Sequence, residues 1–177
     1  ALSDFLRFSL NRGKEYCTVD QELSHIRNYS LVQSIRFPDE FEVDFTVDPE
    51  LGDKMMLKLL LQPLVENAMI HGIQKKGDKG RISIHAERKG GHMCFMVLDD
   101  GAGMPEEQLS RVRSSLNEAE GEAQSDASYG LRNVHERLLL HYGADAGLTL
   151  ESRQGVGTRV SFTIPMKEAA HENLDRG

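Results

Sequence analysis

Apolar and polar side chains alternate with a period of two in several short segments. Residues 41–48 show this most clearly, with apolar side chains at the odd positions and polar ones at the even positions. This period is typical of a strand with one buried face. Turn residues, mainly glycine, separate most of these segments. The sequence therefore predicts five strands, at 41–48, 81–88, 92–99, 148–153 and 159–165.

Other segments carry apolar residues at a helical spacing. They predict a helix near the start of the chain that Asn11–Gly13 breaks, and four more helices at 19–35, 55–70, 104–116 and 131–141. Thr18 or Asp20 would begin the second helix, and Gly72 would end the third. Residues 117–128 contain no large apolar side chain, and we expect this segment to be mobile.

These elements predict an α/β (α+β) two-layer sandwich. Most strand connections are short enough for hairpins, which favours a mixed, mainly antiparallel sheet with helices on one face and further helices before it. A length of 177 residues fits one domain with a sizeable core. We expect residues 1–38 to be a helical region and linker, 39–166 the main domain and 167–177 a polar tail.

Composition narrows the function classes. No stretch approaches the roughly 20 apolar residues that a membrane helix needs. The formal net charge of −7 disfavours nucleic acid as a partner, since a nucleic-acid-binding surface needs a basic patch. Two cysteines are too few for a disulfide framework, and none of the Cys and His residues has zinc-site spacing.

The end of the strand at 92–99 is a candidate ligand site. The apolar run stops at Asp99, and Gly101 and Gly103 follow in the turn. Glycines leave the backbone open to close approach by a flat ligand, beside a carboxylate that accepts hydrogen bonds. An Asp-Gly turn is also an ordinary hairpin element, so this motif alone leaves both interpretations open.

The predicted helix at 55–70 carries a second group of polar residues near its end. Asn67 and His71 lie four residues apart and share one face, which is otherwise apolar. A polar side chain there needs partners. Glu66 lies beside Asn67 but about 100° around the helix. Each residue could also be structural: a paired core amide, a histidine at a helix end, and a solvated or capping carboxylate.

Two glycine-containing motifs follow downstream. Gly130 precedes the predicted helix at 131–141, where free backbone N–H groups favour an anion. Arg132 could reach a phosphate or lie in solvent on the helix surface. Thr158 begins the last strand after Gly155-Val156-Gly157, a position that also suits an ordinary β-branched residue.

The four motifs together resemble the N, G1, G2 and G3 boxes of the ATPase superfamily shared by DNA gyrase, heat-shock chaperones and sensor histidine kinases. The runs at 61–68 (LQPLVENA) and 130–138 (GLRNVHERL) resemble one subclass, the LytS-type sensor histidine kinases. Residues 2–10 and 25–30 resemble the end of that subclass's dimerisation and phosphoacceptor region. The resemblance covers about residues 1–165.

This resemblance implies a Bergerat-type ATPase fold that binds ATP and Mg²⁺. Asn67 would ligate magnesium, His71 would face the phosphates, and Asp99 would accept a hydrogen bond from the adenine amino group. The remaining nucleotide contacts would come from Gly101, Gly103, Gly130, Leu131, Arg132 and Thr158, beneath a lid at about 104–128. Glu66 would be the catalytic residue.

The implied reaction transfers the γ-phosphoryl group to a histidine and then to an aspartate of a response regulator. The subclass places its phosphoacceptor histidine in a Pro-His-Phe motif that this sequence lacks, and we interpret His25 as a helix-surface residue. The resemblance further implies a homodimer through the upstream helices, and a cytoplasmic domain whose parent protein is anchored in the bacterial inner membrane.

Three positions depart from the family pattern. Pro63 stands where most members have an acidic residue or Asn, Asp100 where Asn is usual, and Ser128 where a glycine is usual. They favour an alternative, a nucleotide-binding regulatory module or a degenerate kinase without phosphotransfer. A gyrase-like or chaperone-like ATPase would need a lysine from a second domain, which this chain does not contain.

Overall fold

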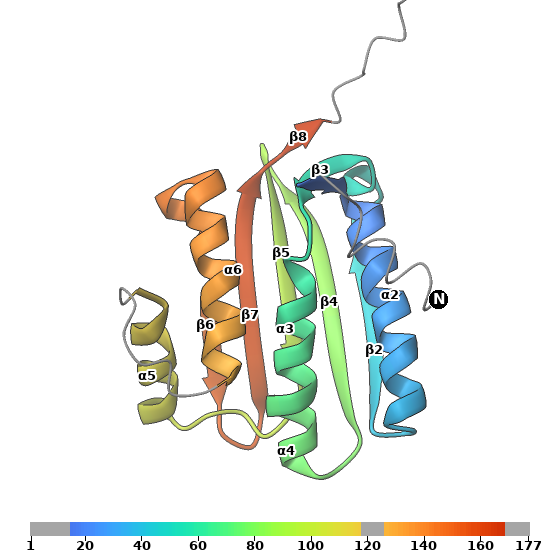
Figure 1. Cartoon of the computed structure of the whole chain (residues 1–177), viewed down its shortest axis with the longest axis vertical. Coiled ribbons are helices and arrows are strands. Elements are labelled where there is room, and N and C mark those ends of the chain that lie inside the picture. The colour runs from blue at the N-terminus through green and yellow to red at the C-terminus, as the bar shows by residue number, and fades with distance from the viewer. Residues whose placement is uncertain (1–14, 118–125, 169–177) are drawn as a thin grey trace, which may run out of the picture.

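A computed structural model describes residues 15–117 and 126–168 (Figure 1). Its main feature is a five-stranded sheet in the order β2-β4-β5-β7-β6, in which β2 and β4 pair in parallel and the other neighbours pair antiparallel. The five strands are β2 (Phe41–Val47), β4 (Gly80–Lys89), β5 (His92–Asp99), β6 (Thr149–Arg153) and β7 (Gly157–Pro165). All five strands predicted from the alternating pattern are therefore confirmed.

Helices α2 (Val19–Arg36), α3 (Leu61–Asn67) and α6 (Asp126–Tyr142) lie along one face of this sheet, as Figure 1 shows. Helix α5 (Glu106–Asn117) lies beyond α6, toward the β6 edge. One apolar core joins the helices to the sheet, with Leu23, Leu64, Phe95, Leu138 and Ile164 among its members. The two-layer α/β fold with a mainly antiparallel sheet is thus confirmed.

Helix α2 begins where the sequence predicts. The Thr18 hydroxyl accepts from the backbone N–H of Gln21 at 3.2 Å, and the Gln21 side chain accepts from the Thr18 N–H at 3.0 Å. This reciprocal capping box satisfies two N–H groups that the helix start would otherwise leave unpaired. The predicted helix at 2–10 lies outside the described residues.

The predicted helix at 55–70 is wrong at its start. Residues Lys54–Leu57 form strand β3, which pairs with β1 (Tyr16–Thr18) on one side and β8 (Lys167–Glu168) on the other. Leu59 then turns the chain with a φ of 58°. Only afterwards does α3 begin, and a π-helical segment, Ala68–Ile73, and the short α4 (Gln74–Lys76) follow it.

The predicted helix at 131–141 begins earlier than expected. Helix α6 starts at Asp126, so Gly130 is its fifth residue and does not lie at its N-terminus. Glycine inside a helix costs only about 1 kcal/mol relative to alanine, which the packing of α6 offsets. Residues 118–125, most of the segment expected to be mobile, lie outside the described residues. No helix within the described ranges is long and apolar enough to span a membrane.

Candidate functional site

Three of the sequence motifs meet where β5 ends. Asp99 is the last residue of β5 and lies opposite Thr158 of β7 in the antiparallel register. The π-helical segment that follows Asn67 packs against the same point, because the backbone N–H of Ala102 donates to the Gly72 carbonyl at 3.0 Å. The motifs around Asn67, Asp99 and Thr158 therefore form one site.

Glycines, which have no side chain, allow these backbone segments to approach one another so closely. A Cβ on Gly72 would lie 2.6 Å from Oδ1 of Asp99, and a Cβ on Gly101 would lie 2.5 Å from Cα of Gly72. Both separations are shorter than van der Waals contact. Gly157, with a φ of 133°, packs in the same way against the carbonyl oxygen of Asp99. Backbone segments thus pack closely together around the end of β5.

Asp99 is a largely buried carboxylate with two backbone donors. Its Oδ1 accepts from the N–H of Gly101 at 2.9 Å, and the N–H of Thr158 donates to it as well. Burial raises the pKa of Asp99 to about 6, and the two hydrogen bonds oppose that rise. The group is therefore ionised at pH 7.5 but only weakly stabilised as an anion, and a ligand donor would stabilise it further.

Ser152 is a site residue that the sequence analysis missed. Its hydroxyl accepts from the N–H of Met104 at 2.9 Å, donates to the Gly157 carbonyl at 3.0 Å and pairs with the Thr158 hydroxyl at 2.9 Å. It thereby joins the start of the expected lid to the last strand. The available signal was its position, since Ser152 follows the buried Leu150 by two residues and shares its face of β6.

Asp100 has a structural role in the turn after β5. Its carboxylate accepts from the backbone N–H of Arg81 at 2.8 Å, and Lys76 lies 3.8 Å away and donates to the Asp100 carbonyl. These contacts fasten the turn after β5 to the start of β4. The departure from Asn at this position leaves Asp99 in place.

The N-box residues lie on two sides of α3 and its continuation. Asn67 is half-buried, and no hydrogen bond joins its side chain to any other residue of the described ranges. His71 is half-buried in the π-helical segment. Glu66 accepts from the Gln62 side chain at 2.7 Å. Among the described residues, no three His, Cys, Asp or Glu side chains converge to hold a metal ion.

The three G2-motif residues, Gly130, Leu131 and Arg132, have different surroundings. Leu131 is a core residue at 2% exposure, so its side chain faces the interior. Arg132 pairs with Glu136 of the same helix at 2.7 Å. A Cβ on Gly130 would make only an ordinary contact with Pro63, at 3.9 Å. Gly130 therefore does not lie at a free helix N-terminus, and its contact with a nucleotide stays a prediction.

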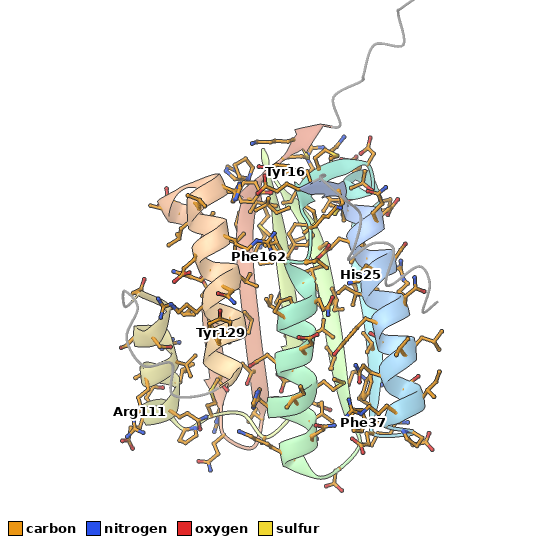
Figure 2. The ribbon with its side chains drawn as sticks, viewed as in Figure 1. Tyr16, His25, Phe37, Arg111, Tyr129 and Phe162 are labelled. Carbon is orange, nitrogen blue, oxygen red and sulfur yellow. The ribbon has the colours of Figure 1, made fainter. Side chains whose placement is uncertain are left out.

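His25 is also not where the sequence analysis placed it. It is 2% exposed, and its Nε2 lies 2.6 Å from the side-chain oxygen of Gln62 on α3. Figure 2 shows His25 between α2 and α3. The interpretation as a helix-surface histidine is wrong, because the helical stripe that Val19, Leu23 and Ile26 begin is wide enough to include it.

Two known protein families match most of the chain. Residues 52–168 match the family of histidine kinase-, DNA gyrase B- and HSP90-like ATPases, and residues 1–41 match the histidine kinase family. The chain belongs to this ATPase family, within its histidine kinase branch. The resemblance inferred from the four boxes is therefore confirmed.

Curated relatives are sensor kinases. The chain is 31% identical to the sensor protein LytS of Bacillus cereus over 174 residues, which are 98% of this chain and 29% of LytS. It is 32% identical to the sensor protein kinase HptS of Staphylococcus aureus strain USA300 over 165 residues, 93% of this chain and 31% of HptS. The chain thus spans less than a third of the length of these relatives.

Solved structures share the fold. The catalytic domain of histidine kinase ThkA matches with a TM-score of 0.61 at 19% identity, covering 86% of this chain and 95% of that one. The histidine kinase domain of a blue-light-activated kinase from Erythrobacter litoralis matches with a TM-score of 0.59 at 21% identity, covering 93% and 71%. Both confirm a histidine kinase ATPase fold.

Proposed function

We propose that this chain is the catalytic and ATP-binding domain of a two-component sensor histidine kinase. The observation that carries the proposal is the buried Asp99 carboxylate where three of the four boxes meet. A carboxylate accepts from the exocyclic amine of adenine but has nothing to offer the carbonyl at the same position of guanine. Gly101 and Gly103 leave the backbone beside it open to the base.

The residues near Asn67 fit magnesium on a triphosphate. Mg²⁺ takes hard oxygen ligands and keeps several waters, so one amide oxygen with phosphate oxygens is a reasonable shell. Asn67 has such an oxygen, and it accepts no hydrogen bond from another residue of the described ranges. The ion would neutralise charge on the phosphates, which dominates phosphoryl transfer together with positioning. We propose that His71 and Arg132 face the same phosphates.

The phosphoacceptor is proposed to be a histidine outside these 177 residues. His25 does not suit the role, because its ring is buried and its Nε2 contacts Gln62. A response regulator is the proposed next acceptor of the phosphoryl group. In support, the histidine kinase ThkA has been solved in complex with the response regulator TrrA. That ThkA structure matches this chain with a TM-score of 0.59 at 20% identity, covering 93% of this chain and 47% of that one. Dimerisation through upstream helices and membrane anchoring of the parent protein remain proposals.

The test is phosphotransfer in trans. The chain is incubated with labelled Mg-ATP and a polypeptide carrying a Pro-His-Phe phosphoacceptor helix from a LytS-type kinase. We expect slow formation of an acid-labile, alkali-stable phosphate on that polypeptide, because no covalent connection raises its effective concentration. Asn67→Ala should lose this transfer while its affinity for metal-free ADP changes little.

ATP binding without transfer would favour the alternative, a regulatory module or degenerate kinase. Phosphate on His25 of the chain alone would show that the phosphoacceptor is misassigned. If Asn67→Ala keeps its dependence on magnesium, Asn67 is a core amide and no metal ligand.

A further inference from the structure

Two hydrogen bonds connect His25 on α2, through Gln62, to Glu66 on α3. His25 donates from Nε2 to the Gln62 side-chain oxygen at 2.6 Å, and the Gln62 amide nitrogen donates to Oε1 of Glu66 at 2.7 Å. The directions are consistent, since an amide oxygen only accepts and an amide NH₂ only donates. Figure 2 labels His25 on the side of α2 that faces α3.

Tyr29 is a second donor to the same carboxylate. It lies one helical turn after His25, is 6% exposed, and its hydroxyl hydrogen-bonds to Glu66. Burial, and then the Glu66 charge, raise the pKa of the Tyr29 hydroxyl well above its ordinary value. The hydroxyl therefore keeps its proton at physiological pH. Glu66 receives donors from both helices.

Helix α2 is also fixed to the start of α3. The fully buried Glu22 accepts from the N–H of Leu59 at 2.9 Å and from the N–H of Leu61 at 3.0 Å. These donors lie at the N-terminus of α3, where backbone N–H groups lack partners within the helix. From the other side, Arg137 of α6 donates to the carbonyl oxygens of Lys58 and Leu59 at 2.8 and 3.4 Å. Contacts from α2 and α6 thus fix the start of α3, the helix that carries Gln62 and Glu66.

We propose that Tyr29 and Gln62 are positioning residues, which orient the carboxylate of Glu66, the catalytic residue that the family resemblance implies, toward the nucleophilic histidine. This inference rests on the proposed function. A glutamate on a helix surface samples several rotamers, and two fixed donors restrict it to one orientation. Helix α2 lies within residues 1–41, which match the histidine kinase family, so the carboxylate is oriented by a helix of that matched segment.

The test uses Tyr29→Phe, with Tyr142→Phe as the matched control. Tyr142 is likewise packed and its hydroxyl accepts from the N–H of Leu57 at 2.9 Å, so its removal also deletes a hydroxyl hydrogen bond but leaves both donors to Glu66 in place. Gln62→Met is a second variant, which keeps side-chain length and removes the amide. Each is measured for ATP affinity and for the rate constant of transfer in trans at saturating ATP, alone and combined with Glu66→Gln.

We expect Tyr29→Phe and Gln62→Met to slow transfer about tenfold while ATP affinity changes less than about twofold. Neither should slow transfer further once residue 66 is Gln, whereas Tyr142→Phe should leave the rate constant unchanged. A merely structural role would not depend on residue 66.

Three results would overturn the proposal. Equal rates for Tyr29→Phe and Tyr142→Phe, or the same slowing in the Glu66→Gln background, would refute positioning while the kinase function stands. Unchanged transfer by Glu66→Gln alone would make Glu66 a spectator and remove the need to orient it. A parent chain that binds ATP without any transfer would fail the proposed function itself, and the positioning role with it.

Discussion

The two ends of the proposed nucleotide site are built differently. At the adenine end, Gly72, Gly101 and Gly157 bring backbone segments into direct contact around Asp99. At the phosphate end, a Cβ on Gly130 inside α6 would make only an ordinary contact, and Arg132 already pairs with Glu136. The adenine end is therefore defined by backbone packing before any ligand arrives, whereas the proposed phosphate end depends on side chains.

The largest difference should appear when alanine replaces glycine at each end. In Gly101→Ala the new Cβ meets the Gly72 backbone, which cannot move aside, and we expect a loss of about 3 kcal/mol or more in the free energy of unfolding. Gly130→Ala is the matched control, expected to gain up to about 1 kcal/mol because alanine favours a helix. Urea unfolding measures both, and similar values for the two variants would contradict the comparison.

The pH dependence of binding should report the adenine end alone. The pKa of Asp99 is raised to about 6 in the unliganded chain, and a ligand amine that favours the anion would lower it. Affinity for adenosine should therefore weaken several-fold as the pH falls from 7.5 to 5, since one unit of pKa shift corresponds to about a tenfold change in affinity. Adenosine avoids the phosphate groups, which titrate in the same range.

The same pKa shift predicts an opposite effect on stability. Folding raises the Asp99 pKa above its ordinary value of 3.8, so the folded chain binds more protons than the unfolded chain between these values. Asp99 thus stabilises the fold below about pH 4, and this contribution is lost as the pH rises through 6. Asp99→Asn should stabilise the unliganded chain at pH 7.5 and should also flatten the pH profile of adenosine binding. A profile unchanged in Asp99→Asn would show that another group titrates.

The sequence was sufficient for the sheet and insufficient for the α2–α3 junction. Each strand of the large sheet carries its own alternating or apolar pattern between turn residues, so local information defines it. The apolar run from Met55 contains no local signal that separates strand β3 from helix α3. What separates them is distant in sequence: pairing with β1, and the Glu22 carboxylate that accepts from Leu59 and Leu61.

The candidate site was predictable to the extent that single positions carry it. Asp99, Asn67 and Thr158 stand in recognisable motifs, and the structure brings these motifs together. Ser152 and Tyr29 were not predicted, because their partners come from other elements and no local motif marks them. Gly130 was misplaced because a glycine before an apolar helix suggests a helix start, while α6 extends over the four preceding residues.

The most direct test of the account is nucleotide discrimination by the adenine end. Calorimetric titration with Mg-ATP and Mg-GTP is carried out on the parent chain and on Asp99→Asn at pH 7.5. The account predicts that the parent chain binds ATP and discriminates against GTP, and that Asp99→Asn loses about 1.5–3 kcal/mol of ATP binding, the range for a hydrogen bond to a charged group. Equal affinity of the parent chain for ATP and GTP, or unchanged ATP binding by the folded Asp99→Asn variant, would contradict the assignment of Asp99 to adenine.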